Sequence, residues 1–408
     1  MLRLHIENTL DREEKIMAEW VERKISDIGT VVGGATPSTK KPENYEGGKI
    51  AWITPKDLST FSGRYIERGE RNITEIGLKS CSTQLLPPNT VLFSSRAPIG
   101  YVAITANEVC TNQGFKSVIP NENTDPLFLF YLLKYNKDKI EGMGSGTTFK
   151  EVSGNTMKNI VVNVPSDKKV QEKIATILGS IDDKIEENER INNNLEQQAQ
   201  AIFANEFLSL DTLPEGWKQA SLIDIADYLN GLAMQKYRPT ADETGIPVLK
   251  IKELRQGCCD DNSELCSPSI KSEYIIRDGD VIFSWSGSLL VDFWCGGICG
   301  LNQHLFKVTS NKYNKWFYYA WTKHHLDRFI AVAVDKATTM GHIKRDELSK
   351  AEVLIPNEAD YKRIETLLQP IYDLIIANRI ENKKLAETRD FLLPRLISGE
   401  LDVSDIDL

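Results

Sequence analysis

A seam of apolar residues with the alternating four- and three-residue spacing of a coiled coil runs through the middle of the chain. The same spacing returns near the C-terminal end, with every position shifted by 190 residues. The first seam consists of Ile174, Leu178, Ile181, Ile185, Asn188, Asn192, Leu195, Ala199 and Ile202, and the second of Ile364, Leu368, Ile371, Ile375, Asn378, Asn382, Leu385, Arg389 and Leu392. The pattern predicts two long helical arms. Breaks are expected at Gly179-Ser180 and at Gln369-Pro370, because proline interrupts a helix.

Each seam carries two core asparagines in succession, a device that specifies register at a cost in stability. The four residues are Asn188, Asn192, Asn378 and Asn382. Residues that face each other in an antiparallel pair of helices have residue numbers with a constant sum. Asn188 with Asn382 and Asn192 with Asn378 both give 570, so the two pairs would face each other in one register. This register would satisfy all four amides, and it would leave the charge of Arg389 close to water. The alternative is that each arm lies on its own globule with its asparagines solvated.

Short apolar runs bounded by Gly, Pro, Asn or Ser precede each arm and predict strands. They are AWIT, TVLFSS, GYVAIT and KSVIP before the first arm, and IPVLKI, DVIFSW and LFKVT before the second. An aromatic segment typical of a buried helix follows, LFLFYLLKYN in the first half and NKWFYYAWTKHHLDRF in the second. A short strand ending in proline then leads to the arm. Each half is therefore expected to be an α+β globule followed by a helical arm.

The two halves form an internal repeat. VLFSSRAPIG matches VIFSWSGSLL, and the Asn-Gln pair at 112–113 matches the pair at 302–303, both with a shift of 190. The predicted boundaries are 1–19 for an N-terminal extension, 20–165 for the first globule, 166–212 for the first arm, 213–356 for the second globule and 357–408 for the second arm. The expected fold is α+β, with two pseudo-repeated globules joined by a pair of long antiparallel coiled-coil helices.

Composition and charge restrict the partners that the chain can have. It has 408 residues, of which 41% are hydrophobic and 26% charged, as in ordinary soluble proteins. No run approaches the roughly 18 apolar residues of a membrane span, and the N-terminal stretch lacks a signal-peptide core, so we expect a cytoplasmic location. The net charge of −9 predicts weak DNA binding by the chain alone, although it permits local basic clefts.

Motifs for catalysis are missing from the sequence. It contains no Walker-type phosphate loop and no G-x-G-x-x-G, and none of its histidines lies in an H-E-x-x-H or G-x-S-x-G setting. His304 stands where the first half has Gly114, and a catalytic residue should not be optional between copies. Cys258, Cys259, Cys266, Cys295 and Cys299 lack the paired C-x-x-C spacing of structural zinc, so no metal site is predicted. A binder or scaffold is favoured over an enzyme.

Candidate contact residues gather in loops near the strand ends of both halves. Arg and Lys bind phosphate or guanine, Asn and Gln read adenine, and hydroxyl groups bind phosphate. The predicted DNA contacts are Thr36, Ser38, Lys40, Lys56, Ser95, Arg96, Asn112, Gln113, Thr147, Thr148 and Lys150 in the first half, and Gln235, Lys236, Tyr237, Arg238, Lys250, Lys252, Ser286, Asn302, Gln303, His304, Thr338 and Thr339 in the second. The Asn-Gln pairs have a structural alternative, in which the amide holds a turn through bonds to the backbone.

The segment GGATPSTKKPENYEGGKIAWITPKDLS resembles the start of a target recognition domain in the specificity subunits of type I restriction–modification enzymes. GTTFKEVSGNTMKNIVVNVPSDKKVQEKIATILGSIDDKIEENERI is similar to the central region of that family, LPEGWK to the entry into its second recognition domain, and ETRDFLLPRLISGEL to its C-terminal end. The resemblance covers nearly the whole chain. The second domain departs from the first by having NGLAMQKYRP in place of the opening block, so the two half-sites should differ.

The resemblance implies a subunit without a catalytic site, which reads a split, asymmetric DNA target with one recognition domain for each half. It implies that the paired helices dock two methylation subunits and that two restriction subunits can join, so that S-adenosylmethionine, ATP and magnesium belong to those partners. It also suggests that residues 1–19 pack beside the second arm near the C-terminus. Two other functions stay open, namely a two-domain scaffold for protein partners and a nuclease with a cryptic site.

Overall fold

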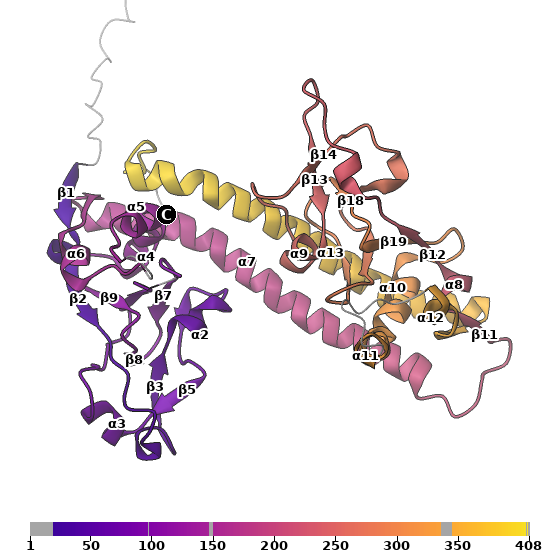
Figure 1. The fold of residues 1–408 in the computed structure, drawn as a ribbon, viewed down its shortest axis with the longest axis horizontal. Coiled ribbons are helices and arrows are strands. Elements are labelled where there is room, and N and C mark those ends of the chain that lie inside the picture. Colours follow the sequence, from indigo (N-terminus) through magenta and orange to yellow (C-terminus); the bar gives the residue numbers. More distant parts are fainter. Residues whose placement is uncertain (1–18, 97, 147–149, 336–344, 405, 407–408) are drawn as a thin grey trace, which may run out of the picture. The chain divides into compact units, whose positions relative to one another are not determined.

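The computed structural model describes residues 19–96, 98–146, 150–335, 345–404 and 406 (Figure 1). The chain forms two compact units. The first unit consists of Met1–Asp183 with Ala386–Leu408, and the second of Lys184–Leu385. Each unit therefore holds one globule together with a part of both arms. The N-terminal extension, residues 1–19, is predicted to pack beside the second arm. All of it except Glu19 lies outside the described residues, so its position stays a prediction.

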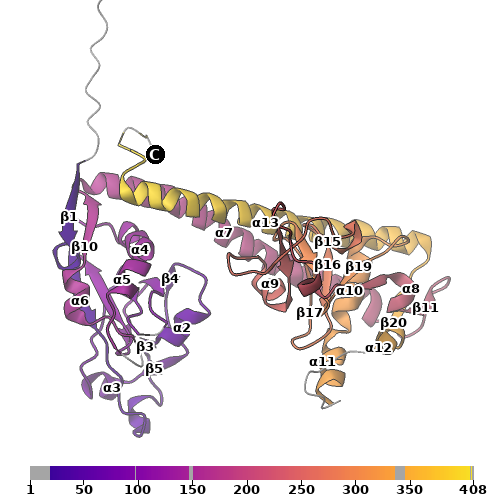
Figure 2. The ribbon, with the colours of Figure 1, turned by 45° about the horizontal axis from the view of Figure 1, so that its top comes forward.

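The first globule is built on small, mostly antiparallel sheets (Figure 2). Its five-stranded sheet has the order β2 (Gly29–Gly33), β9 (Lys116–Pro120), β6 (Val91–Phe93), β7 (Val102–Thr105) and β4 (Tyr65–Ile66). A three-stranded sheet has the order β5 (Arg71–Ile73), β3 (Ile50–Ile53) and β8 (Cys110–Thr111), and β1 (Trp20–Lys24) pairs with β10 (Val161–Pro165). The connecting helices are α1 (Ile25–Ile28), α2 (Pro55–Ser59), α3 (Glu75–Lys79), α4 (Pro126–Tyr135), α5 (Lys137–Gly142) and α6 (Gly154–Asn159), with a 3-10 turn at Pro42–Asn44.

Helix α4 occupies the centre of the first globule's core. The carboxylate of Asp125 caps it by accepting a hydrogen bond from the backbone N–H of Phe128 at 2.7 Å, and Pro126 stands at the start. Its residues from Phe128 to Leu133 are all buried, so the helix is enclosed on every side. The same core includes residues of β6, β7 and β9 and of both arms. Each apolar side chain buried here stabilises the unit by about 1.5–3 kcal/mol.

The second globule repeats this plan with different details. One four-stranded sheet has the order β12 (Asp227–Asn230), β19 (Leu305–Thr309), β16 (Val281–Ser284) and β17 (Leu290–Phe293), and another has the order β14 (Leu265–Cys266), β13 (Ile246–Leu249), β18 (Cys299–Leu301) and β15 (Ile275–Ile276). Strand β11 (Lys218–Ser221) pairs with β20 (Glu352–Ile355). The helices are α8 (Leu222–Ile225), α9 (Ile251–Gln256), α10 (Lys315–His324), α11 (Leu326–Asp335) and α12 (Arg345–Ser349), with 3-10 turns at Met234–Lys236 and Ser272–Tyr274.

The repeat that the sequence predicts is present in the strand pairing. Strand β9 pairs antiparallel with β2 and β6, as β19 does with β12 and β16. Strand β3 runs parallel to β8, as β13 does to β18. The seven strands predicted from apolar runs are found, at β3, β6, β7, β9, β13, β16 and β19, and the short strand before each arm is found at β10 and β20. The second aromatic segment, expected as one helix, forms α10 and α11, and His325 between them is buried with its Nε2 2.8 Å from the carbonyl oxygen of Glu352.

Both arms are continuous where breaks were predicted. Helix α7 (Lys168–Phe203) passes through Gly179, ending in a wider π turn at Ala204–Leu208, and α13 (Glu358–Ser398) passes through Pro370. At Gly179 the missing side chain leaves room for a neighbour, since a Cβ would lie 3.0 Å from Cδ2 of Leu127. At Pro370 the burial of Leu368 and Tyr372 on either side offsets the roughly 3 kcal/mol that proline costs inside a helix.

Within the second unit the arms run antiparallel with the asparagines in contact. Nδ2 of Asn188 donates to Oδ1 of Asn382 at 2.8 Å, and Nδ2 of Asn378 donates to Oδ1 of Asn192 at 2.9 Å. The expectation that all four amides are satisfied is wrong, because Oδ1 of Asn188 is buried without a hydrogen-bond partner among the described residues. The reason is that Asn188 directs its amide nitrogen at both Asn382 and Glu381, which turns its oxygen into the seam.

In the first unit, Arg389 differs from its predicted surroundings. Its side chain is only 18% exposed, and its guanidinium donates to Oδ1 of Asp182 at 2.8 Å and pairs with Asp390. The charge is therefore neutralised by carboxylates of the two arms and is largely withdrawn from water. Asp182 also accepts a hydrogen bond from the hydroxyl of Tyr131 at 2.6 Å, which joins α4 to the same group.

Asn188→Leu should lower the free energy of unfolding of the second unit by about 1–2 kcal/mol, because it removes the partner of the Asn382 amide. The double variant Asn188→Leu/Asn382→Leu should recover much of that loss, because it restores an apolar seam. Urea unfolding of the wild type, the two single variants and the double variant gives the coupling. A double variant that loses the full sum of both single losses would contradict the pairing.

Candidate nucleic-acid interface

The loops that follow β2 and β12 lie at equivalent places although their sequences differ. Gly34 lies against the turn after β8, where a Cβ would come within 2.2 Å of the carbonyl oxygen of Asn112. Gly231 lies in the same way against the turn after β18, where a Cβ would come within 2.2 Å of the carbonyl oxygen of Asn302. No other residue type allows this approach of two backbones. GGATPS and NGLAMQ are therefore structural counterparts, and they carry different side chains on one frame.

The two repeated asparagines both support the turn in which they lie. Oδ1 of Asn112 accepts a hydrogen bond from the backbone N–H of Gly114 at 2.8 Å, and Oδ1 of Asn302 accepts one from the backbone N–H of His304 at 3.3 Å. Such bonds to a backbone two residues ahead are typical of asparagine turns. The geometry favours the structural alternative for the amide oxygen. Base reading by these asparagines stays a prediction.

Asn112→Asp should leave the free energy of unfolding within about 0.5 kcal/mol of the wild type, because the carboxylate keeps an acceptor for Gly114. Asn112→Ala should lower it by about 1 kcal/mol, because that N–H then loses its partner. Urea unfolding separates the two. Equal losses in the aspartate and alanine variants would show that the acceptor is not what the turn needs.

The repeated glutamines are held by neighbouring predicted contacts. Gln113 is exposed, and its Oε1 accepts a hydrogen bond from the hydroxyl of Thr36. In the second unit Nε2 of Gln303 lies 3.4 Å from Nε2 of His304, whose Nδ1 lies 3.1 Å from Oγ of Ser286. The fold thus brings Thr36 to Gln113, and Ser286 and His304 to Gln303. An amide that is already oriented loses less entropy on meeting a base edge.

Trp285 belongs to this second cluster and was not selected from the sequence. Its indole nitrogen donates to Oδ1 of Asn230 at 3.1 Å, and its ring centroid lies 6.1 Å from that of His304. Aromatic rings at loop ends are stacking platforms for bases. The sequence did contain a signal for it, because Trp285 stands in SWSGS where the first copy has Ser95.

Two of the predicted hydroxyl contacts are buried. Ser95 is 0% exposed and donates its hydroxyl to the carbonyl oxygen of Gly114 at 3.1 Å, and Ser286 is 3% exposed. A hydroxyl group that is enclosed and hydrogen-bonded in this way supports a loop in this conformation and does not face a phosphate. Of their neighbours, Arg96 is exposed and Trp285 is half-buried.

Carboxylates engage many of the predicted cationic contacts. The pairs are Arg96–Glu151 at 3.0 Å, Lys56–Glu70 at 2.8 Å, Arg238–Glu264 at 3.1 Å, Lys250–Glu264, and Lys252–Asp260 at 3.0 Å. Burial would raise the pKa of Glu151, but Arg96 and Lys116 together hold it below its ordinary value. Lys250 and, more weakly, Arg238 lower the pKa of Glu264. Ion pairs with this exposure are weak because water screens them, so an incoming phosphate can compete with them.

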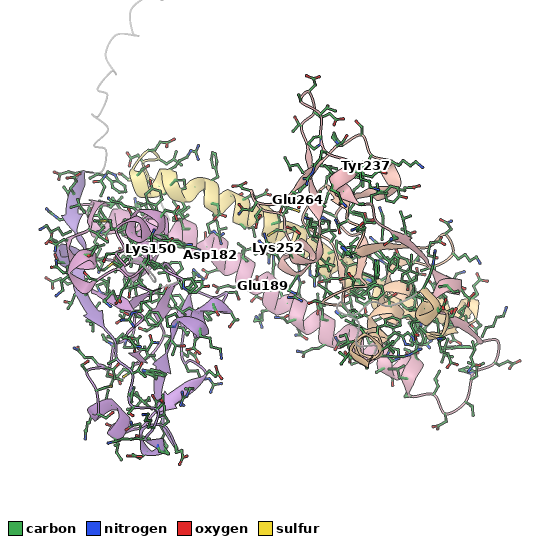
Figure 3. The ribbon with its side chains drawn as sticks, viewed as in Figure 1. Lys150, Asp182, Glu189, Tyr237, Lys252 and Glu264 are labelled. Carbon is green, nitrogen blue, oxygen red and sulfur yellow. The ribbon has the colours of Figure 1, made fainter. Side chains whose placement is uncertain are left out.

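The remaining predicted contacts divide into exposed residues and residues beyond the described part. The exposed ones are Ser38, Lys40, Lys150, Gln235, Lys236 and Tyr237, of which Lys150 and Tyr237 are labelled in Figure 3. Thr147, Thr148, Thr338 and Thr339 lie outside the described residues.

The described residues contain no cluster for a metal ion and no helix that could cross a membrane. Within them no group of three or more His, Cys, Asp or Glu side chains is placed to hold a metal ion. The seven cysteines are unbridged thiols, and Sγ of Cys259 lies 3.5 Å from Sγ of Cys299. None of the described helices is long and apolar enough to cross a membrane.

Comparison with protein families identifies the repeat. The model of the type I restriction modification DNA specificity domain matches the chain twice, over residues 17–197 and 214–387. The chain belongs to the specificity subunits of type I restriction–modification systems. Specificity subunits are the non-catalytic, DNA-recognition component of these systems.

Individual specificity subunits resemble the chain along its whole length. The chain is 35% identical over 419 residues to the specificity subunit of the type I restriction enzyme MjaIX from Methanocaldococcus jannaschii, covering 96% of both chains. It is 22% identical to the specificity subunit of the HindI enzyme from Haemophilus influenzae, covering 94% of this chain and all of that one. The fold is similar to the crystal structure of the S subunit from M. genitalium, with a TM-score of 0.59 at 14% identity, covering 95% and 97% of the two chains.

Proposed function

We propose that this specificity subunit reads a bipartite, asymmetric DNA target, with residues 20–165 as the first target recognition domain and residues 213–356 as the second. The observation that carries the proposal is the pair of counterpart loops after β2 and β12. They take the same place against the same turn, fixed by Gly34 and Gly231, and differ in nearly every side chain. The two domains share a backbone arrangement but present different side chains to DNA, which suits a target whose two halves differ in sequence.

The helical regions 166–212 and 357–408 are proposed to dock two methylation subunits and, through the assembled complex, two restriction subunits. In this proposal S-adenosylmethionine, ATP and magnesium are bound by those partners, and the complex acts on DNA in the cytoplasm. The net charge of −9 and the carboxylates beside the predicted cations favour a chain that binds DNA firmly only within the complex.

The test is a genome-wide map of methylated adenine in cells with and without this gene. A split, asymmetric motif that disappears on deletion is the expected result. Exchange of residues 213–356 for those of another specificity subunit should then change one half of the motif and leave the other unchanged. A change in both halves, or in neither, would contradict the assignment of one domain to each half.

A further inference from the structure

Two glutamates of the predicted DNA-contact region each hold two cations. In the first unit Oε2 of Glu151 lies 3.0 Å from Nε of Arg96, and its Oε1 lies 3.4 Å from Nζ of Lys116. In the second unit Oε2 of Glu264 lies 3.1 Å from Nη2 of Arg238, and its Oε1 contacts Nζ of Lys250. Each carboxylate therefore uses both of its oxygens, one for an arginine and one for a lysine.

The arrangement is not part of the repeat, because the residues are not at equivalent positions in the two halves. Glu151 and Glu264 are 113 positions apart, whereas the repeat has a shift of 190. Glu151 follows the loop of the first Thr-Thr pair, and Glu264 directly precedes β14. The same combination of arginine, lysine and carboxylate has thus formed from non-equivalent residues beside the loops that differ between the two domains.

Both sites match the chemistry of a DNA phosphate. A phosphodiester presents two unesterified oxygens that share one negative charge, as a carboxylate does, and arginine with lysine is the usual protein partner of that group. The stems of the lysines are partly enclosed, since the side chain of Lys116 is 14% exposed and that of Lys250 is 37% exposed. The ammonium group of Lys116 also lies 3.5 Å from Oγ of Ser95, so its position does not rest on Glu151 alone.

The glutamates can leave at little cost. The side chain of Glu151 is 35% exposed and that of Glu264 is 42% exposed, and both arginines are close to half exposed. Solvated pairs of this kind are weak, because water compensates most of the Coulomb energy when they separate. A polyanion that offers a phosphate at the same point can then displace the carboxylate.

We propose that Arg96 with Lys116, and Arg238 with Lys250, form one binding site for a DNA backbone phosphate in each domain, and that Glu151 and Glu264 occupy these sites until DNA displaces them. The inference rests on the proposed function and adds Lys116 to the contact residues. While the glutamates are in place, they neutralise the charge of the arginine and lysine side chains. DNA that is not aligned on its target sequence is then attracted less strongly. Binding is then firm only where enough other contacts are made to displace them.

The experiment uses the full chain assembled with its cognate methylation subunit and carrying Glu151→Gln, Glu264→Gln or both. Binding to a duplex without the target motif is measured over a range of salt concentrations. Each single variant should tighten this binding by about two- to fivefold, because the two weak ion pairs of that glutamate no longer have to be broken. The double variant should show the product of the two effects, since the sites lie in different domains.

Glu122→Gln is the matched control. Glu122 is exposed and follows the Pro120 end of β9, whereas Lys116 begins that strand, and its substitution changes the net charge by the same amount. Arg96→Gln in the Glu151→Gln background should remove most of the gain, because the released arginine is then absent. Unfolding midpoints of all variants verify that each protein is folded.

The results distinguish the inference from the function on which it rests. If the wild-type complex has no salt-sensitive preference for its own motif, the proposed function fails and the phosphate sites fail with it. If the wild type has that preference but Glu151→Gln and Glu264→Gln bind no tighter than Glu122→Gln, only the inference is overturned. Weaker binding in the glutamine variants would also overturn it, because it would show that the carboxylates themselves contact the DNA.

Discussion

Replacement of Phe207 by alanine should lower the free energy of unfolding of the second unit by about 3–5 kcal/mol, the cost of deleting a buried phenylalanine ring and leaving a cavity. Phe207 is 2% exposed and ends the first arm inside the core of the second globule. Its ring centroid lies 5.3 Å from that of Trp321, 5.6 Å from that of Trp217 and 5.0 Å from that of Phe203. The ring thus joins the first arm to the segment that begins the globule, through Trp217, and to helix α10, through Trp321.

Urea unfolding followed by tryptophan fluorescence measures this loss, because two of the rings in contact with Phe207 are indoles. Leu208→Ala is the control, since Leu208 is the next residue and its side chain is 48% exposed. We expect it to change the free energy of unfolding by less than about 0.5 kcal/mol. A loss below about 1 kcal/mol in Phe207→Ala would mean that the neighbouring aromatic rings close the space, and that this contact does not hold the arm.

Elements that depend on periodic burial could be predicted from the sequence. The heptad spacing located both arms because Ile174, Leu178, Ile364 and Leu368 must all be excluded from water, and each is 0% exposed. The strands were found for the same reason, since runs such as VLF at β6 are enclosed on both faces. The α+β class and the duplication followed from these patterns together with the constant shift of 190 residues.

Contacts between polar residues far apart in the sequence could not be predicted, because no periodic pattern records them. Arg64 is 6% exposed, donates to the carbonyl oxygen of Gly179 at 3.2 Å and pairs with Asp183. Arg389 reaches Asp182 across 207 positions of sequence. Proline and glycine rules failed in the arms for a related reason. They describe an isolated helix, whereas packing on both sides of Pro370 decides the outcome here.

Contacts among the candidate DNA-binding residues could be predicted only in part. Some of the loops chosen from the sequence do lie next to one another, since Thr36 contacts Gln113 and Ser286 contacts His304. Residue type alone could not show that Ser95 is buried or that Arg96 is paired with Glu151. Burial and pairing depend on which segments the fold brings together. The list of contacts therefore stays a prediction.

Arg379→Met should lower the free energy of unfolding of the second unit by about 2–3 kcal/mol, somewhat less than the loss of a fully buried pair, because the groups are about a quarter exposed. Arg379 lies on α13 and donates to Oδ1 of Asp292 on β17 at 2.6 Å and to Oε1 of Glu196 on α7 at 2.8 Å. Methionine keeps the apolar part of the side chain and removes the guanidinium group. Asp292 and Glu196 then lose the cation that they share. Arg379→Lys keeps the charge and should lose about half as much.

The control for this prediction is Arg190→Met, measured by the same urea unfolding. Arg190 pairs with Glu187 within α7 at 2.7 Å and is 74% exposed, so its replacement should leave the free energy of unfolding close to that of the wild type. The comparison asks what holds the second recognition domain on its two helices. If Arg379→Met costs no more than Arg190→Met, the apolar contacts suffice, among them the stacked rings of Phe293 and Tyr319 at 3.9 Å. If it costs the expected amount, one guanidinium fixes three elements at once.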